Sequence, residues 1–378
     1  MKLAIFTLPL HANYGGILQA YALQTTLERM GHEVVVMNHL RYSPLLFGGV
    51  LRALANWAGR KLLLDLKLHI EKGRAKMENM LIRQHTDRFT SRYIHSRWLK
   101  DLHDFSEGEV DAFVVGSDQI WRGYYFEKSW VSPLPDAFLD FASGWRVKRW
   151  AYGVSFGVDT WEFPEELTPH LAELMQLFEG VSVREDSAIQ LCRKHLGVEA
   201  QHVLDPTMLL APEDYQRLID NAHSDRKQAS QPFLSTYILD YSQEKENLAK
   251  RVAHEKGLEI LRLGALYPME ANVPLEERLV PPVEDWLRGM AEAEMVVTDS
   301  FHGCVFSILF HKPFIAIGNP GRGLTRMESL LRQFHLEDHL LTHAPDYDPE
   351  RTYDLGHHVD ALLDQWRQRS LRFLKQIG

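Results

Sequence analysis

Glycines and polar side chains follow the apolar stretches of this sequence, where expected strands give way to expected helices. The first such segment is HANYGGILQ, residues 11–19, which comes after the apolar run at residues 3–8. Its paired glycines allow the backbone to approach a ligand closely at the start of a helix. The spacing differs from the GxGxxG pattern, and no Lys-Ser or Lys-Thr pair follows Gly16 as a phosphate-binding P-loop requires. A ligand-binding loop and an ordinary strand-to-helix turn both fit this segment.

A second polar segment is GSDQIW, residues 116–121, which follows the apolar run at residues 111–116. A carboxylate, an amide and an indole are the groups that bind sugar hydroxyls and stack on a sugar ring. The alternative is that Ser117 or Asp118 only caps the next helix. Capping explains neither Gly116 nor Trp121, so the sequence favours a sugar-binding site.

The remaining candidates are cationic and point to an anion. Arg184 follows an apolar strand and offers a planar, permanently charged guanidinium, although an ion pair with a neighbouring acid explains it equally well. In VVTDSFHGC, residues 296–304, a strand ends and His302 opens a helix, a position suited to binding an anion and transferring a proton. The loop at residues 318–326 adds Arg322 and Arg326. Together these residues predict an anion pocket in the second half of the chain.

Short apolar runs alternate with helical patterns, which predicts an α/β fold with parallel sheets. Six strands are expected in a first series and four in a second, at residues 3–8, 33–38, 111–116, 150–155, 181–184 and 202–205, then 233–239, 258–263, 295–298 and 313–317. We place a domain boundary near residue 212, giving domains at 1–212 and 213–378. The last helix, at residues 359–375, is expected either to cap the second domain or to cross back to the first.

The composition excludes several classes of protein. With 378 residues, 45% hydrophobic and 25% charged, the chain is an ordinary globular protein, too polar for a membrane transporter. A net charge of −9 disfavours wholesale nucleic-acid binding. Two cysteines cannot build a disulfide scaffold, and no histidine spacing such as HExxH predicts a metal site. No apolar run reaches the roughly 20 residues of a membrane span, so we expect a cytoplasmic protein.

Residues 41–100 depart from this average, with 13 Lys and Arg against 4 Asp and Glu. A helix with Leu, Trp and basic residues is expected within this segment, at residues 51–70. One interpretation is peripheral docking on an anionic membrane that presents a lipid-linked substrate. Three acids, at positions 65, 71 and 78, interrupt the basic face, which favours the other interpretation, a solvated helix.

Five segments in order resemble the polysaccharide pyruvyl transferase family: NYGGILQAYALQ at 13–24, VGSDQIW at 115–121, SVRE at 182–185, VLDP at 203–206 and TDSFHG at 298–303. The resemblance spans about residues 10–335. It implies two Rossmann-like domains facing across a cleft, similar to GT-B glycosyltransferases. It also implies transfer of pyruvate from phosphoenolpyruvate (PEP) to two hydroxyls of a glycan or lipid-linked oligosaccharide, forming a ketal without a cofactor, in the biosynthesis of a cell-surface polysaccharide.

The resemblance assigns roles to the candidate residues. Arg184 and His302 match family residues that bind the PEP anion, whereas Ser300 stands where the family has an arginine, and we hypothesise that Arg322 or Arg326 supplies that charge. His302 is expected to donate a proton or steady the departing phosphate, and Asp118 to orient or deprotonate the acceptor. The expected donor-binding residues are Arg184, Ser300, Phe301, His302, Gly303, Arg322 and Arg326. The expected acceptor-binding residues are Asn13, Tyr14, Gly15, Gly16, Gln19, Ser117, Asp118 and Trp121.

Two other functions are compatible with the same sequence. A nucleotide-sugar glycosyltransferase shares the expected architecture, since a fold does not fix a function. A glycan-binding protein that has lost its donor chemistry is the second alternative, because Ser300 replaces a family arginine. Binding of UDP-sugars or of PEP distinguishes these alternatives. The sequence predicts neither the acceptor sugar nor the oligomeric state.

Overall fold

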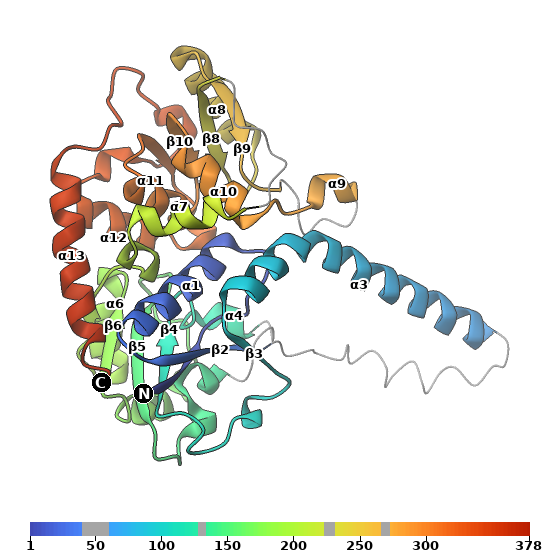
Figure 1. Ribbon diagram of the computed structural model, residues 1–378, viewed down its shortest axis with the longest axis vertical. Helices are drawn as coiled ribbons and strands as arrows, with labels where there is room; N and C mark the ends of the chain where they lie inside the picture. The colour runs from blue at the N-terminus through green and yellow to red at the C-terminus, as the bar shows by residue number, and fades with distance from the viewer. Residues whose placement is uncertain (40–59, 128–133, 223–230, 266–272) are drawn as a thin grey trace.

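The computed structural model describes residues 1–39, 60–127, 134–222, 231–265 and 273–378. These residues form two parallel sheets with helices on their faces (Figure 1). The seven-stranded sheet has the order β3-β2-β1-β4-β5-β6-β7 and the five-stranded sheet the order β12-β11-β10-β8-β9. The first sheet contains β1 (Lys2–Phe6), β2 (Glu33–His39), β3 (Ser96–Leu99), β4 (Ala112–Gly116), β5 (Lys148–Val154), β6 (Gly180–Val183) and β7 (Gln201–His202). The second contains β8 (Phe233–Tyr237), β9 (Glu259–Arg262), β10 (Met295–Thr298), β11 (Phe314–Ile317) and β12 (Leu340–Leu341).

All ten strands expected from the sequence are present, with ends that differ by a few residues. The central strands are continuous apolar runs because helices cover both faces of each sheet; β4, for example, is buried along its whole length. The edge strands β3 and β12 were not predicted from the sequence. Each is short, and β3 alternates poorly, with Trp98 60% exposed, so neither gives the apolar signal of a central strand.

The helices follow the strands as in two Rossmann-like domains, so the predicted α/β, GT-B-like fold class is confirmed. Their bounds are α1 (Tyr14–Arg29), α3 (Arg60–Tyr93), α4 (Gly123–Glu127), α5 (Thr168–Met175), α6 (Asp186–Leu191), α7 (Pro212–Asp220), α8 (Gln243–Lys256), α9 (Leu275–Arg278), α10 (Val283–Ala291), α11 (Phe301–Leu309), α12 (Leu324–Phe334) and α13 (His358–Leu374). The boundary that we placed near residue 212 lies at the start of α7, between the last strand of the first sheet and the first strand of the second.

The last helix, α13, returns to the first sheet, as Figure 1 shows at the left of the molecule. Ser370 on this helix accepts a hydrogen bond from the backbone N–H of Leu204, and the ring of Phe373 lies 5.7 Å from that of Trp150. Of the two arrangements considered for the C-terminal helix, the structure therefore has the one that crosses back. This crossing fastens the two domains together at the side remote from α3.

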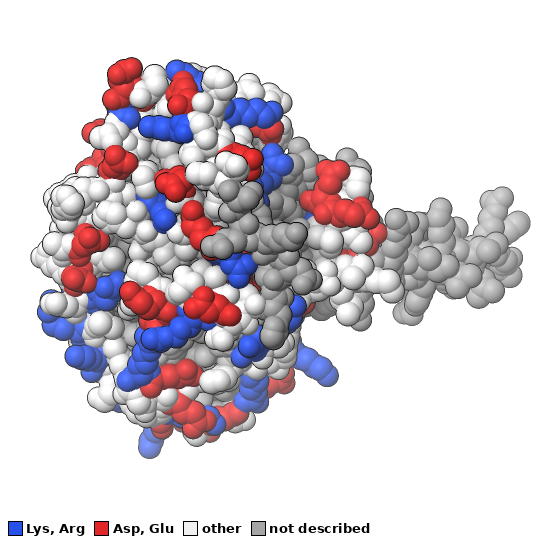
Figure 2. Space-filling model, turned by 45° about the horizontal axis from the view of Figure 1, so that its top comes forward, with Lys and Arg blue, Asp and Glu red and all other residues white. Residues whose placement is uncertain are grey.

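The long helix α3 projects from the body of the molecule (Figure 1). Its C-terminal part packs against the second domain, where Glu78 forms an ion pair with Arg278 at 2.9 Å. Residues 40–59 lie outside the described residues, and with them the first part of the helix expected at 51–70, whose second part, residues 60–70, belongs to α3. Membrane docking by this segment stays a prediction. Among the described residues, no helix is both long and apolar enough to cross a bilayer. On the face shown in Figure 2, acidic and basic side chains are interspersed.

Candidate active site

A cavity open to solvent lies between the two domains, at the carboxyl ends of strands from both sheets. This is where ligands bind in open parallel sheets. The first domain lines it with Asn13, Asp118, Gln119 and Tyr125. The second domain lines it with Leu239, Asp299, Ser300, Phe301, His302, Asn319, Arg322, Gly323, Leu324, Arg326 and Met327.

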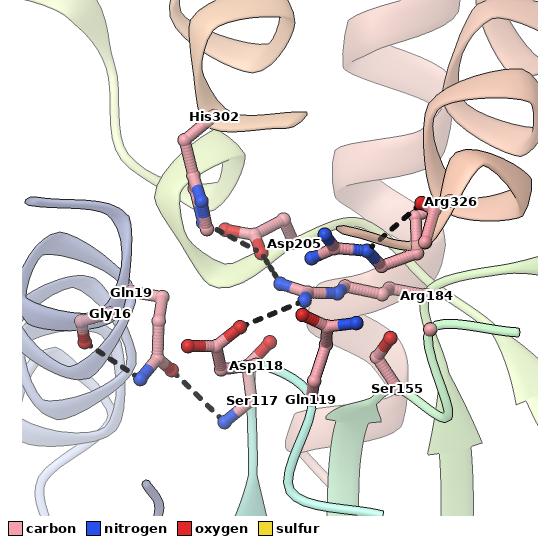
Figure 3. A network of polar contacts seen from close by, with 12 residues as sticks. Gly16, Gln19, Ser117, Asp118, Gln119, Ser155, Arg184, Asp205, His302 and Arg326 are labelled. Carbon is pink, nitrogen blue, oxygen red and sulfur yellow. Dashed lines mark hydrogen bonds and ion pairs between the residues drawn. The ribbon is translucent and has the colours of Figure 1, made fainter. Parts of the chain in front are cut away.

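Arg184 follows β6 and lies beneath this cavity, with its side chain only 1% exposed. Its Nη1 donates to Asp205 Oδ2 at 2.7 Å and its Nη2 to Asp118 Oδ1 at 3.1 Å (Figure 3). Burial acts to lower the pKa of Arg184, but the two carboxylates outweigh it and raise the pKa. Arg184 is thus already bound by two carboxylates and does not line the cavity. Its direct role as a ligand for the PEP anion, expected from the resemblance, does not fit this geometry.

His302, from α11 of the second domain, points toward Asp205 of the first (Figure 3). Its Nε2 lies 3.5 Å from Asp205 Oδ2. Burial acts to raise the pKa of Asp205, but His302 and Arg184 together lower it. Asp205 is therefore a carboxylate that connects Arg184 to His302. The pair forms only where the two domains meet.

The two glycines at the start of α1 have a packing role at this same place. A methyl group at Gly15 would overlap the imidazole of His302, and one at Gly16 would lie 3.3 Å from Asp118 Oδ2. The absence of side chains lets the N-terminus of α1 approach both residues. The predicted segment therefore lies at the candidate site, where its glycines make room for the side chains of His302 and Asp118.

Arg326, on α12, is the cation that the cavity leaves without a carboxylate partner. Its N–H groups donate to the backbone carbonyls of Arg322 and Gly323, and no carboxylate of the described residues forms an ion pair with it. Its guanidinium lies 5.2 Å from the ring centroid of Phe301, and that of Arg184 lies 4.6 Å from the same centroid. Burial, followed by the charge of Arg184, lowers the pKa of Arg326 to about 10, although the nearby carboxylates of Asp118 and Glu185 act to raise it. An anion bound in the cavity would offset both the burial of the Arg326 charge and its repulsion by Arg184.

Arg322, the other candidate for the missing charge, is already paired. Its Nε and Nη2 donate to the two carboxylate oxygens of Asp240 at 2.8 and 2.7 Å, and its side chain is 47% exposed. Of the two arginines proposed from the sequence, Arg326 is the one available to a ligand, while Arg322 stands at the rim.

Ser300 and Gly303 build the start of α11. Ser300 is the N-cap, and its Oγ accepts a hydrogen bond from the N–H of Gly303 at 3.4 Å. A methyl group at Gly303 would overlap the side chain of Thr298. These two residues therefore position His302 and Phe301, and the helix N-terminus that they form faces the cavity.

Trp121 corrects one expectation for the acceptor side. Its side chain is fully buried, its ring stacks on Phe138 at 5.0 Å, and its indole N–H donates to the carbonyl of Ala137. The indole belongs to the core of the first domain, so it cannot stack on a sugar ring as the sequence suggested. The chain turns over residues 118–121 after β4, and this turn brings the indole of Trp121 into the core.

Three further residues expected to bind the acceptor are also supports. Tyr14 donates to the carbonyl of Pro281 at 2.8 Å and lies in the interface with the second domain. Gln19 and Ser117 are fully buried, and the Ser117 N–H donates to Gln19 Oε1 at 3.0 Å (Figure 3). These contacts join α1 to the loop that carries Asp118. Of the expected acceptor residues, Asn13 and Asp118 line the cavity.

The comparisons with known proteins agree with the motifs. A sequence model of the family named polysaccharide pyruvyl transferase matches residues 13–321 of the 378. The chain belongs to the polysaccharide pyruvyl transferase family. A comparison with curated proteins finds no match.

Solved structures similar to this chain include two sugar-nucleotide enzymes. UDP-GlcNAc 2-epimerase from Neisseria meningitidis, bound to UDP-GlcNAc, is 11% identical, with 97% of this chain and 100% of that chain covered and a TM-score of 0.47. The E. coli ADP-heptose LPS heptosyltransferase II is 13% identical, with 97% and 99% covered and a TM-score of 0.37. At these TM-scores the likenesses add no argument to the strand order described above.

Several residues of the candidate site were not among the binding residues predicted from the sequence, although Gln119 is the amide of the segment at 116–121. Asp205 pairs with both Arg184 and His302, and its place after an expected strand was a usable signal. Gln119 and Tyr125 line the cavity. Within the described residues, no group of three or more His, Cys, Asp or Glu side chains is placed to bind a metal.

Proposed function

We propose that this pyruvyl transferase moves pyruvate from PEP to two hydroxyls of a glycan sugar, forming a cyclic ketal, with no cofactor. The observation that carries the proposal is Arg326, a buried cation that lines the cavity beside His302 and forms no ion pair with a carboxylate of the described residues. A buried charge is costly unless it is paired, so this arrangement favours an anionic ligand. The phosphate and carboxylate of PEP supply such an anion.

Ketal formation requires three tasks. A proton adds to the methylene carbon of PEP, a sugar hydroxyl attacks the resulting oxocarbenium-like carbon, and phosphate leaves before a second hydroxyl closes the ring. One proton enters at carbon; of the two hydroxyl protons, one replaces it and the other leaves on the released phosphate. The site must therefore hold an anion, donate a proton and direct the hydroxyls.

We assign these tasks to residues of both domains. Arg326 and the N-terminus of α11 offset the charge of the donor as it develops on the departing phosphate. His302 donates the proton, or steadies the phosphate as it leaves. Burial acts to raise the pKa of Asp118, but Arg184, His302 and Arg326 lower it, so Asp118 is a weak base that orients an acceptor hydroxyl.

In this proposal Arg184 acts through its neighbours. It holds Asp118 and Asp205 in place, and Asp205 in turn faces His302. The acceptor is a glycan or a lipid-linked oligosaccharide of cell-surface polysaccharide biosynthesis. A cytoplasmic enzyme at the inner face of a membrane is the setting that we propose for it.

The proposal is tested by measuring thermal unfolding of the wild type with and without PEP. A ligand that binds the folded state alone stabilises it by about 2.7 kcal/mol at a hundredfold excess over Kd. Arg326→Gln should abolish the effect of PEP. Arg332→Gln is the matched control, because Arg332 lies on the same helix, is 47% exposed and does not line the cavity.

Two results would contradict the proposal. Stabilisation by UDP-sugars but not by PEP would indicate a nucleotide-sugar glycosyltransferase. Stabilisation by PEP that is unchanged in Arg326→Gln would show that Arg326 does not bind the donor. Phosphate release from PEP in the presence of candidate glycans then identifies the acceptor.

A further inference from the structure

Tyr125, on the short helix α4, lines the cavity from the first domain, opposite α11 and α12. Its position differs from that of its neighbour Tyr124, which is 44% exposed and does not line the cavity. With Trp121 buried in the core, Tyr125 is the one aromatic residue of the first domain, among those the structure describes, that lines the cavity. A phenol in this place has a hydroxyl that is able to donate to a ligand.

Tyr125 lines the same cavity as Arg322 and Arg326. Its charge interaction acts to raise the pKa of both guanidinium groups. A hydroxyl beside two cations is well placed to donate to an anion bound by the same cations. The two arginines belong to the second domain and Tyr125 to the first, so an anion here would be held from both sides.

The partner of Tyr125 makes this hydroxyl available. Tyr125 Oη donates to Gln119 Oε1 at 3.0 Å, while Gln119 Nε2 is buried and has no acceptor among the described residues. A buried amide donor without a partner is unfavourable. Rotating the amide by half a turn places the NH2 group toward Tyr125 Oη, and this rotation breaks no hydrogen bond of the NH2 group. Gln119 would then donate to Tyr125, whose own hydroxyl hydrogen becomes free.

We propose that Tyr125 is a binding residue for the anionic group of the donor, oriented by Gln119 and contributed by the domain opposite Arg326. The anion receives a hydrogen bond from Tyr125 Oη, which accepts one from Gln119 Nε2. The identity of the anion as PEP rests on the proposed function, whereas the donor geometry requires only a phosphate or carboxylate group. Binding would thereby link the two domains through a ligand.

The test compares Tyr125→Phe with Tyr124→Phe, using inorganic phosphate and PEP as separate probes of the full chain. Calorimetric titration of Tyr125→Phe should show a Kd raised about tenfold for both probes, the loss expected for one hydrogen bond to a charged group. Tyr124→Phe should leave both Kd values unchanged. Equal thermal unfolding of the two variants without ligand shows that each is folded.

A second comparison tests the part assigned to Gln119. Gln119→Met should weaken phosphate binding, and the double variant with Tyr125→Phe should bind no worse than the weaker single variant. Additive losses of binding free energy in the double variant would refute the proposal that Gln119 orients the Tyr125 hydroxyl. Unchanged binding in Tyr125→Phe, for either probe that the wild type binds, would overturn the inference alone. If the wild type binds phosphate but not PEP, the proposed function is overturned, and the phosphate titrations alone decide the inference about Tyr125. If the wild type binds neither probe, both are overturned.

Discussion

Removal of the Arg184 charge should destabilise the whole protein, because this side chain compensates two buried carboxylates. Arg184 is 1% exposed, Asp118 is 8% exposed and Asp205 is fully buried at the side chain. In Arg184→Met the apolar stem is kept and the two ion pairs are lost. Breaking a buried pair from one side costs about 3–5 kcal/mol, so we expect a loss in this range in the free energy of unfolding.

The pH dependence has a definite sign. In the wild type the pKa values of Asp118 and Asp205 are lowered, so their contribution to stability is present above the unfolded pKa, about 4, and is lost as pH falls through the folded values. Without Arg184, burial opposes the charged carboxylates more strongly and both folded pKa values rise. The stability gap between wild type and Arg184→Met should therefore narrow as pH falls from about 7 toward about 4.

Urea unfolding of both proteins at several pH values measures this gap. Arg332→Gln is the matched control: its ion pair with Asp186 is 47% and 42% exposed, and a surface pair of this kind contributes about 0–1 kcal/mol. A loss in Arg184→Met no larger than in the control would refute the reasoning. If that variant were stable and also failed to bind PEP, Arg184 would be a direct ligand of the donor.

Two further substitutions test the packing around the site. Gly15→Ala should lower kcat at least about tenfold while PEP still binds, because the added methyl group displaces the His302 imidazole. Gly16→Ala should lower kcat less, because its methyl group would lie 3.3 Å from Asp118 Oδ2. Equal kcat values in the two variants would contradict the packing role of Gly15. Trp121→Phe should lower the free energy of unfolding by about 1–3 kcal/mol without changing the acceptor KM, because the indole is buried against Phe138. A raised acceptor KM with unchanged stability would show instead that Trp121 binds the acceptor.

The central strands of both sheets could be predicted from the pattern of apolar residues in the sequence. Strands such as β1 and β10 are apolar on both faces because helices cover both sides of a parallel sheet, so each is visible as an unbroken run in the sequence. The segments that follow these strands contribute residues to the cavity lining, since the carboxyl ends of parallel strands meet at one edge. The edge strand β3 was not predicted, because it is partly exposed and therefore lacks the unbroken apolar run of a central strand.

The sequence could not decide which residues of those segments face the cavity. Trp121 and Tyr125 are four positions apart, yet one packs in the core and the other lines the cavity. Arg184 and Arg326 have the same side chain, but two carboxylates bind the first and none forms an ion pair with the second among the described residues. Contacts such as these join residues far apart in the chain, so residue type and spacing leave them open.

The sequence by itself determined the family, the alternation of strands and helices, and the segments that hold the site. Only the tertiary structure decided the roles within it, above all that Asp205 of one domain faces His302 of the other. The physical reason is that strand and helix patterns arise from neighbours in the chain, whereas the charge balance of a buried site depends on which distant groups are brought together.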